Sequence, residues 1–199
     1  MKLEDWEYFF IFIGFVVIII LLNPIIKNDF FLDHEEFFEM AILGKNKLAE
    51  DYFIGSENIT IGKPIEWYIY IFNHMGELKK IEIKVKIIKS YMMPPDSVNC
   101  EPDSEISILD IPLSIENNEF YFYNFTWLIS EVFNTNDKEI MIKINDVRIQ
   151  EDISINDDSS FRILFELWVY NEKSKQYEFG WLSKGEPRCV WNQIWCQIS

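Results

Sequence analysis

The sequence predicts a mainly β protein, with one N-terminal transmembrane helix followed by an antiparallel two-sheet β-sandwich. Tyr8–Leu22 is an unbroken apolar run without a single charge, which is typical of a membrane-spanning helix. Later segments are instead rich in β-branched and aromatic residues that alternate with polar ones, the pattern of strands. Seven or eight such segments can be counted, and this number is expected of a two-sheet sandwich.

The first element is the predicted transmembrane helix, which covers residues 6–26. At about 1.5 Å of rise per residue, this stretch is long enough to cross a hydrocarbon core of about 30 Å, so the lipid bilayer is its expected partner. A cleaved signal peptide would need a basic leader and a small-residue cleavage site, and neither flank has them. A buried helix would need a polar stripe, which the run lacks. We therefore expect an uncleaved anchor over residues 1–27.

The sequence indicates the orientation of the chain in the membrane less directly than it indicates the span itself. Lys2 lies on one side of the predicted span, and Lys27, Lys45 and Lys47 lie on the other, so positive charge favours neither orientation clearly. We expect a single-pass protein of the cell membrane, with the C-terminal domain extracytoplasmic. The expected organisation is an anchor over residues 1–27, a juxtamembrane connector over residues 28–40 and a sandwich domain with a Cys/Trp-rich tail over residues 41–199.

The predicted strands follow a connector in which Asp33–Met40 is expected to form a short helix. A glycine-bearing segment at Asn73–Glu77 has the length of a hairpin connection. Glu82, Lys84 and Lys86 alternate with apolar residues and are expected to face water, whereas the strand over 161–170 is apolar on both faces and is expected to lie centrally. A polar, proline-bearing loop is expected over 94–105. The main predicted strands are 65–72, 81–87, 120–127, 140–147 and 161–170, with shorter candidates at 59–61, 106–109 and 177–181.

Composition excludes several classes of function. The net charge of −15 repels the phosphates of nucleic acids and of anionic lipids, so nucleic acid is not expected as a partner. The chain has only seven glycines, no glycine-rich phosphate loop and no G-x-S-x-G nucleophile motif. We therefore expect no catalytic residues, no cofactor and no enzymatic activity.

Several short motifs resemble a known family. These are Ile42-Leu43-Gly44, Leu48–Tyr52, Ile59–Pro64 and Asn73–Gly76, and they are followed by a late strand at 161–170. In this order they resemble the C-terminal β-domain of an archaeal membrane protein family, catalogued as domain of unknown function 1616. The resemblance covers residues 37–89 and extends to 161–179. It implies an outward-facing immunoglobulin-like sandwich and no reaction. The chain departs from the family pattern in having one predicted span rather than several, and in its cysteine-bearing tail.

Three cysteines leave the disulfide pairing open. Cys189 and Cys196 are seven positions apart, about 23 Å on a straight strand, but a tight hairpin would bring them within bridging distance. Cys100, in the proline-rich loop, is able to take either partner. The interpretation adopted is a Cys189–Cys196 bridge in an extracytoplasmic domain. The alternative is three reduced thiols in a cytoplasmic one.

No metal site is expected. With two histidines, neither near a cysteine in sequence, zinc is disfavoured. His34 and the acidic residues after it would overlap only partly on one helical face. His74 is expected to bond to backbone groups in its connection. The acidic groups around Asp96 and around residues 156–158 lack the spacing of an EF-hand and are typical of turns.

Two sequons and a tryptophan-rich tail are the remaining candidate sites. Asn58 and Asn124 each begin an N-x-T glycosylation sequon, although Asn124 lies inside a predicted strand. Trp181, Trp191 and Trp195 are expected to form an interface with another subunit or with the lipid surface.

The function expected from these observations is that of a non-catalytic structural or accessory subunit of a membrane or envelope complex, in contact with other membrane protein subunits. The alternative is an extracytoplasmic module that binds a glycan, metal or peptide. A membrane-tethered enzyme is the third possibility.

Overall fold

The protein is described by a computed structural model over residues 35–53, 58–134, 138–145, 147–155 and 159–199. The predicted anchor, 1–27, and the connector up to residue 34 lie outside these residues. Within the described part of the chain, no helix is both long and apolar enough to cross a membrane.

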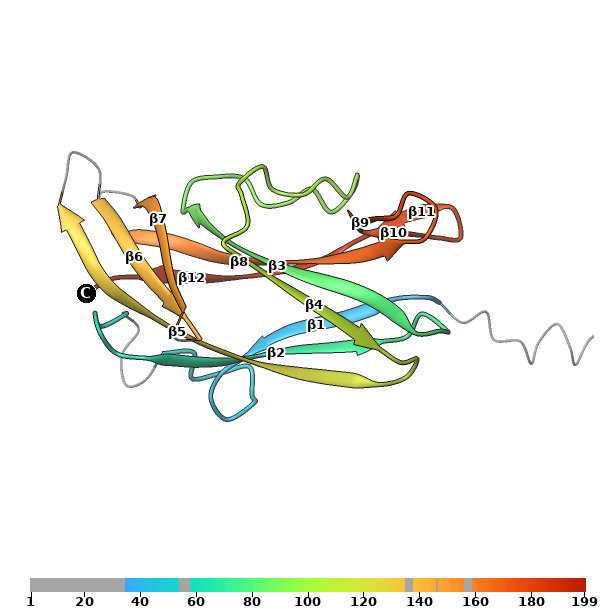
Figure 1. Ribbon diagram of the computed structural model, residues 1–199, viewed down its shortest axis with the longest axis horizontal. Helices are drawn as coiled ribbons and strands as arrows, with labels where there is room; N and C mark the ends of the chain where they lie inside the picture. Colours follow the sequence, from blue (N-terminus) through green and yellow to red (C-terminus); the bar gives the residue numbers. More distant parts are fainter. Residues whose placement is uncertain (1–34, 54–57, 135–137, 146, 156–158) are drawn as a thin grey trace, which may run out of the picture. The chain divides into compact units, whose positions relative to one another are not determined.

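The β domain consists of two antiparallel sheets that face each other, which confirms the predicted mainly β sandwich (Figure 1). The first sheet has the order β1-β2-β5-β6-β7. The second has the order β12-β8-β3-β4, with β9 beside β8, and a small β10-β11 hairpin stands apart. The strands are β1 (Phe38–Leu43), β2 (Ile65–Asn73), β3 (Lys79–Lys89), β4 (Leu109–Ile115), β5 (Phe120–Asn134), β6 (Lys138–Ile144), β7 (Val147–Ile155), β8 (Ser160–Asn171), β9 (Gln176–Phe179), β10 (Trp181–Ser183), β11 (Glu186–Arg188) and β12 (Val190–Gln197).

Aromatic side chains from both sheets meet in the core. Trp67 of β2 lies 5.0 Å from Trp127 of β5 and 6.3 Å from Phe165 of β8, measured between ring centroids. Phe125 of β5 contacts Phe165 edge-on at 5.4 Å. All four side chains are fully or almost fully buried. Such edge-to-face pairs add to the hydrophobic stabilisation that holds the two sheets together.

The predicted hairpin between β2 and β3 is wrong, because these strands lie in different sheets. β2 pairs with β1 and β5, whereas β3 pairs with β4 and β8. The connection is therefore an arch that leads from the first sheet to the second at the edge of the core. Asn73 at the end of β2 is completely buried, and its amide nitrogen donates to the carbonyls of Glu77 and Ile115 at 2.9 and 2.8 Å. Its side-chain oxygen accepts from the Met75 backbone N–H at 2.9 Å.

The N-terminal edge also differs from expectation. Phe38–Leu43 forms β1 rather than the end of a short helix, and it pairs along β2 from Phe38 opposite Asn73 to Leu43 opposite Tyr68. Phe38 and Ile42 enter the core, but residues four positions apart would also share one face of a helix. The reason for the strand is therefore tertiary, because all six residues pair along β2.

The outer face of the second sheet is covered, and the expected exposure of Lys86 is wrong. The β3–β4 loop folds over this face (Figure 1), and Lys86 forms a buried ion pair of 2.9 Å with Glu166 of β8. Both side chains also hold the loop: Lys86 Nζ donates to the Asp103 carbonyl at 2.6 Å, and the Asp103 N–H donates to Glu166 at 2.7 Å. Buried charges require such complete pairing. At the loop's other end, Arg162 donates to the backbone carbonyl of Met92.

Other strand expectations are confirmed with shifted boundaries. β8 lies centrally between β12 and β3, as its two apolar faces predict. The predicted strand 140–147 is instead the end of β6, a turn and the start of β7. Ile59 forms only an isolated bridge with Ile198. The predicted strand 177–181 is broken by Gly180 (φ 90°), where a Cβ would lie 2.4 Å from the Arg188 carbonyl oxygen.

We predict that Asn73→Ala lowers the free energy of unfolding by about 3 kcal/mol, because two carbonyls and one N–H lose their buried partner. Asn117→Ala removes one solvent-exposed bond to the Gly76 N–H in the same region and should cost less than about 1 kcal/mol. Denaturant unfolding of the full-length protein in mild detergent measures both. Equal costs for the two variants would contradict the assigned role of Asn73.

Candidate functional site

The outer face of the first sheet carries a continuous group of aromatic side chains, which we call the aromatic face. It is built by alternation: in β2 every second residue enters the core, and β5 follows the same pattern from Tyr123 onward. The residues between them point outward. Phe120 is 58% exposed, and its neighbours in the group are half-buried. The aromatic face consists of Tyr68, Tyr70, Phe72, Phe120 and Phe122.

Strand register brings these rings into contact. Tyr70 lies opposite Phe122 and Phe72 opposite Phe120 across the β2–β5 pair. The Tyr70 and Phe122 ring centroids are 5.3 Å apart, those of Phe120 and Phe122 are 5.6 Å apart, and those of Phe72 and Phe120 are 6.4 Å apart. Aromatic pairs directly across two strands stabilise a sheet, but stability does not require them to be left open to solvent. Phe120 stays largely exposed and the other rings are only half-buried, which makes this face a candidate contact surface.

Charged and polar groups border the aromatic face. At one end the Lys47 ammonium lies 4.9 Å from the Tyr68 ring centroid and 4.7 Å from that of Phe122. At the other end the His74 imidazole stacks on Phe72, with 4.0 Å between the ring centroids, and its Nε2 lies 3.3 Å from a Glu39 oxygen. An apolar centre with a polar rim is the usual composition of a protein interface.

The two tyrosines of the face are held protonated. A hydrogen bond from the Tyr68 hydroxyl to Glu66, at 2.9 Å, is the main cause that raises the pKa of Tyr68. Partial desolvation, followed by the nearby Glu39 charge, raises the pKa of Tyr70. Both hydroxyls are therefore hydrogen-bond donors at physiological pH.

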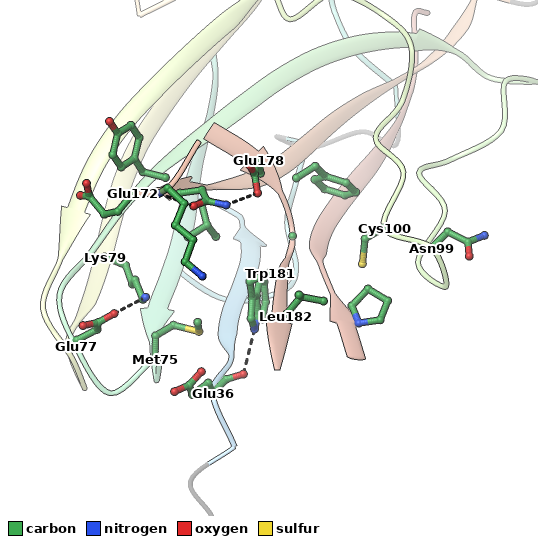
Figure 2. Close-up of a pocket in the computed structure, with 17 residues that line it drawn as sticks. Glu36, Met75, Glu77, Lys79, Asn99, Cys100, Glu172, Glu178, Trp181 and Leu182 are labelled. Atoms are coloured by element: carbon green, nitrogen blue, oxygen red, sulfur yellow. Dashed lines mark hydrogen bonds and ion pairs between the residues drawn. The ribbon is translucent and has the colours of Figure 1, made fainter. Parts of the chain in front are cut away.

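A broad cleft of about 610 Å³ opens beside the β8–β9 hairpin (Figure 2). Met75 and Lys79 line one side, Tyr170 and Phe179 come from the hairpin, and Asn99 and Cys100 come from the β3–β4 loop. In Figure 2, Asn99 and Cys100 stand across the cleft from Glu77 and Lys79. The cleft therefore gathers segments that are far apart in the sequence.

Three carboxylates at this cleft already have partners. Lys79 contacts Glu77 at 2.6 Å, and this contact lowers the pKa of Glu77. Glu178 accepts hydrogen bonds from Asn171 at 2.8 Å and Ser174 at 2.6 Å, which lower its pKa. Glu172 is paired with Lys175 at 2.7 Å. Carboxylates that are held ionised in this way are poor general acids and offer few unshared charges to a ligand.

The structure does not bring the three predicted interface tryptophans together. Trp181 lines the cleft, where its Nε1 donates to the Glu36 carbonyl at 3.2 Å and its ring meets Phe38 edge-on at 5.4 Å. Trp191 donates to Ser97 of the β3–β4 loop at 3.0 Å. Trp195 is 57% exposed and covers the Arg162 guanidinium at 5.0 Å. An interface role for them stays a prediction.

The two sequons lie in different surroundings. Asn124 is exposed on the outer side of β5, and its side-chain oxygen accepts from Thr126 Oγ1 of the same sequon at 2.9 Å. Asn58 is half-buried beside the Ile59–Ile198 bridge. Their use as glycosylation sites stays a prediction.

All three cysteines are free, and the expected Cys189–Cys196 bridge is wrong for this structure. The tail is the straight strand β12 rather than a hairpin, so that Cys189 precedes its first residue and Cys196 lies near its end. These residues are separated by about 23 Å along the strand. Cys189 instead lies beside the turn that carries Cys100, since its sulfur is 3.9 Å from the carbonyl oxygens of Asp96 and Ser97.

The acidic groups behave as turn residues where the structure describes them. Asp96 accepts from the Val98 N–H at 2.7 Å and from the Asn99 side chain at 2.7 Å, and these bonds lower its pKa. Asp103 accepts from the Glu105 N–H at 2.8 Å. Across the described residues, no group of three or more His, Cys, Asp or Glu side chains is arranged to hold a metal ion. His34 and residues 156–158 lie outside them.

Sequence reasoning missed the aromatic face, although its signal is present. The segments IEWYIYIF and FYFYNFTW were interpreted only as strands. In each, large aromatic residues occupy both alternating sets of positions, so that one set must face outward unless the strand is covered on both sides.

The sequence matches no protein-family model and no curated protein. Among solved structures, the chain is similar to the CARDB domain of a Pyrococcus furiosus protein in complex with di-metal ions, with 10% sequence identity and a TM-score of 0.39. The similarity covers 83% of this chain and 90% of that one.

We predict that Trp181→Ala lowers the free energy of unfolding by about 2 kcal/mol or more, because its ring packs against Phe38 beside the core. Trp195→Ala, at an exposed ring, should cost about 1 kcal/mol or less. Thermal or denaturant unfolding of both full-length variants measures the difference. A larger cost for Trp195 would contradict the described packing.

Proposed function

We propose that this protein is a non-catalytic, single-pass membrane-anchored subunit that has a structural or accessory role in a membrane or envelope complex. Residues 6–26 anchor it in the bilayer, and the immunoglobulin-like sandwich is extracytoplasmic. The resemblance to the archaeal family described above supports this assignment.

The observation that carries the proposal is the aromatic face. Rigid aromatic side chains supply large contact area at low entropic cost and are enriched at the centres of protein interfaces. Here the Tyr70–Phe122 pair lies at the centre and Phe120 is the most exposed ring, while Lys47, Glu66 and His74 supply a polar rim. The occupant that fits is the surface of another membrane protein subunit with an apolar centre. The net charge of −15 disfavours an anionic occupant.

The ligand-binding alternative would use the cleft beside the β8–β9 hairpin. Its volume suits a small molecule. However, the Glu77, Glu172 and Glu178 carboxylates are already paired, so the aromatic face supports the contact function better.

We predict that full-length protein solubilised gently from native membranes co-migrates with a stoichiometric membrane partner. The double variant Phe120→Ser/Phe122→Ser should release that partner at unchanged abundance, because it removes the most exposed ring of the aromatic face and the ring beside it. The matched control Tyr91→Ser/Met93→Ser removes two highly exposed apolar side chains from the β3–β4 loop and should retain the partner. Native electrophoresis and mass spectrometry of the purified species measure both.

A crosslinking experiment locates the contact. A photo-reactive phenylalanine analogue in place of Phe120 should crosslink to the partner, and the same analogue in place of Tyr91 should not. Recovery of the wild-type chain alone, or equal crosslinking at both positions, would overturn the proposal and redirect attention to the cleft.

We also predict that a membrane-impermeant amine reagent labels the exposed Lys45 and Lys173 in intact cells. An extracytoplasmic domain presents both ammonium groups to the medium, whereas a cytoplasmic one hides them. Peptide mass spectrometry compares labelling before and after cell lysis. Labelling that requires lysis would show the opposite orientation.

A further inference from the structure

The middle of the β3–β4 loop docks onto the start of β12. Backbone hydrogen bonds between Asp96 and Glu101, at 3.0 and 3.2 Å, close a turn over residues 96–101. Ser97 of this turn accepts from Trp191 at 3.0 Å, and the Cys189 sulfur lies 3.9 Å from the carbonyl oxygens of Asp96 and Ser97. Cys100 belongs to the same turn, so that the docking brings two thiols together.

Cys100 and Cys189 are separated by 88 intervening residues in the sequence. The docked turn carries Cys100 to the start of β12, and Cys100 is one of the groups that raise the pKa of Cys189. Both side chains are half-buried, which leaves them accessible to a reagent from one side. A disulfide needs two cysteines that the fold holds close together, and the docking of this turn onto the start of β12 provides such an arrangement.

We propose that Cys100 and Cys189 form a disulfide that fastens the β3–β4 loop to β12, and that the two free thiols are its reduced form. The oxidant is a disulfide of a small molecule or of a thiol–disulfide oxidoreductase. An extracytoplasmic domain would meet such oxidants. The inference goes beyond the proposed function and does not depend on it, because its chemistry is tested on the purified chain.

The exchange proceeds in two steps. The Cys100 thiolate attacks one sulfur of the oxidant, which forms a mixed disulfide and releases the other sulfur as a thiolate. Cys189 then loses its proton and attacks the Cys100 sulfur, which forms the internal bridge and releases the second thiolate of the oxidant. In total the two cysteines lose two protons and two electrons, and the oxidant's disulfide is reduced to two thiols.

The surroundings of the two thiols determine which of them attacks the oxidant first. Burial, then the hydrogen bond to Cys100 and the nearby Cys100, Asp96 and Glu166 charges, raise the pKa of Cys189 to about 12. Cys189 is therefore the proton donor of the pair and Cys100 the first nucleophile. Once Cys100 is bound in a mixed disulfide, its charge no longer opposes the ionisation of Cys189.

Cys196 is excluded from the pair. It lies on the inner side of β12, packed in the core, and burial raises the pKa of its thiol well above the usual value. An inward-facing thiol at the far end of β12 cannot reach either partner without unfolding the strand.

The bridge would also fix one wall of the cleft. Asn99 and Cys100 line it from the loop side (Figure 2), and Gly180 at its edge packs against Cys189, where an added Cβ would lie 3.2 Å from the Cys189 Cβ. Arg162, which donates to the Met92 carbonyl, and Lys86, which donates to the Asp103 carbonyl, already hold the two ends of the loop. Oxidation would therefore immobilise the segment between them.

The test uses full-length protein in mild detergent, equilibrated with reduced or oxidised glutathione, quenched with acid and alkylated. After oxidation we expect an intact mass that is lower by two hydrogen atoms before alkylation, a Cys100–Cys189 crosslinked peptide, and Cys196 alkylated only after denaturation. The thermal midpoint should rise by about 5–10 °C over that of the reduced protein.

Matched variants keep the test decisive. Cys196→Ala should retain the crosslink and the thermal shift, whereas Cys100→Ser and Cys189→Ser should each abolish both. Free, alkylatable Cys100 and Cys189 in oxidised glutathione would overturn the proposal, and so would a bridge that contains Cys196. Loss of partner binding in the aromatic-face variant would leave this result unaffected, so the two proposals fail separately.

Discussion

The buried amide of Asn73 is the interaction on which the arrangement of the two sheets depends. A sandwich needs chain segments that leave one sheet and enter the other, and their backbone groups must find partners away from water. Here β2 leads to β3 and β4 leads to β5 at the same end of the molecule. Asn73 binds Glu77 and Met75 in the first connection and Ile115 before the second. One side chain with two donors and one acceptor therefore satisfies both connections at once.

The outer faces of the two sheets differ in whether another part of the chain covers them. On the second sheet the buried Lys86–Glu166 pair is satisfied because the β3–β4 loop supplies Asp103 to both charges. On the first sheet, rings such as Phe120 and Phe122 are held in place by one another, and Phe120 stays largely exposed. A face covered by its own loop is structural, whereas a preorganised apolar face open to solvent gains stability when another surface covers it.

The sequence predicts the strands far better than their partners. Alternation over residues 65–72 and 81–87 identifies β2 and β3, since it reflects a local property of the chain. Whether the short segment after Asn73 is a hairpin or an arch depends on distant strands, and alternation carries no such information. β4 lies later than the predicted strand 106–109, because Pro112 breaks the strand signal and is tolerated only where β4 forms the sheet edge.

The candidate sites were predictable to a smaller extent, for the same reason. The proline-bearing character of the loop over 94–105 is visible in the sequence, but its docking onto β12 depends on the long-range contacts of Glu166 and Trp191. This docking, rather than sequence spacing, places Cys100 beside Cys189 and leaves Cys196 in the core. The buried Lys86–Glu166 ion pair holds the loop at Asp103 and therefore also determines which two cysteines come together. The sequence around each cysteine does not by itself distinguish one from another.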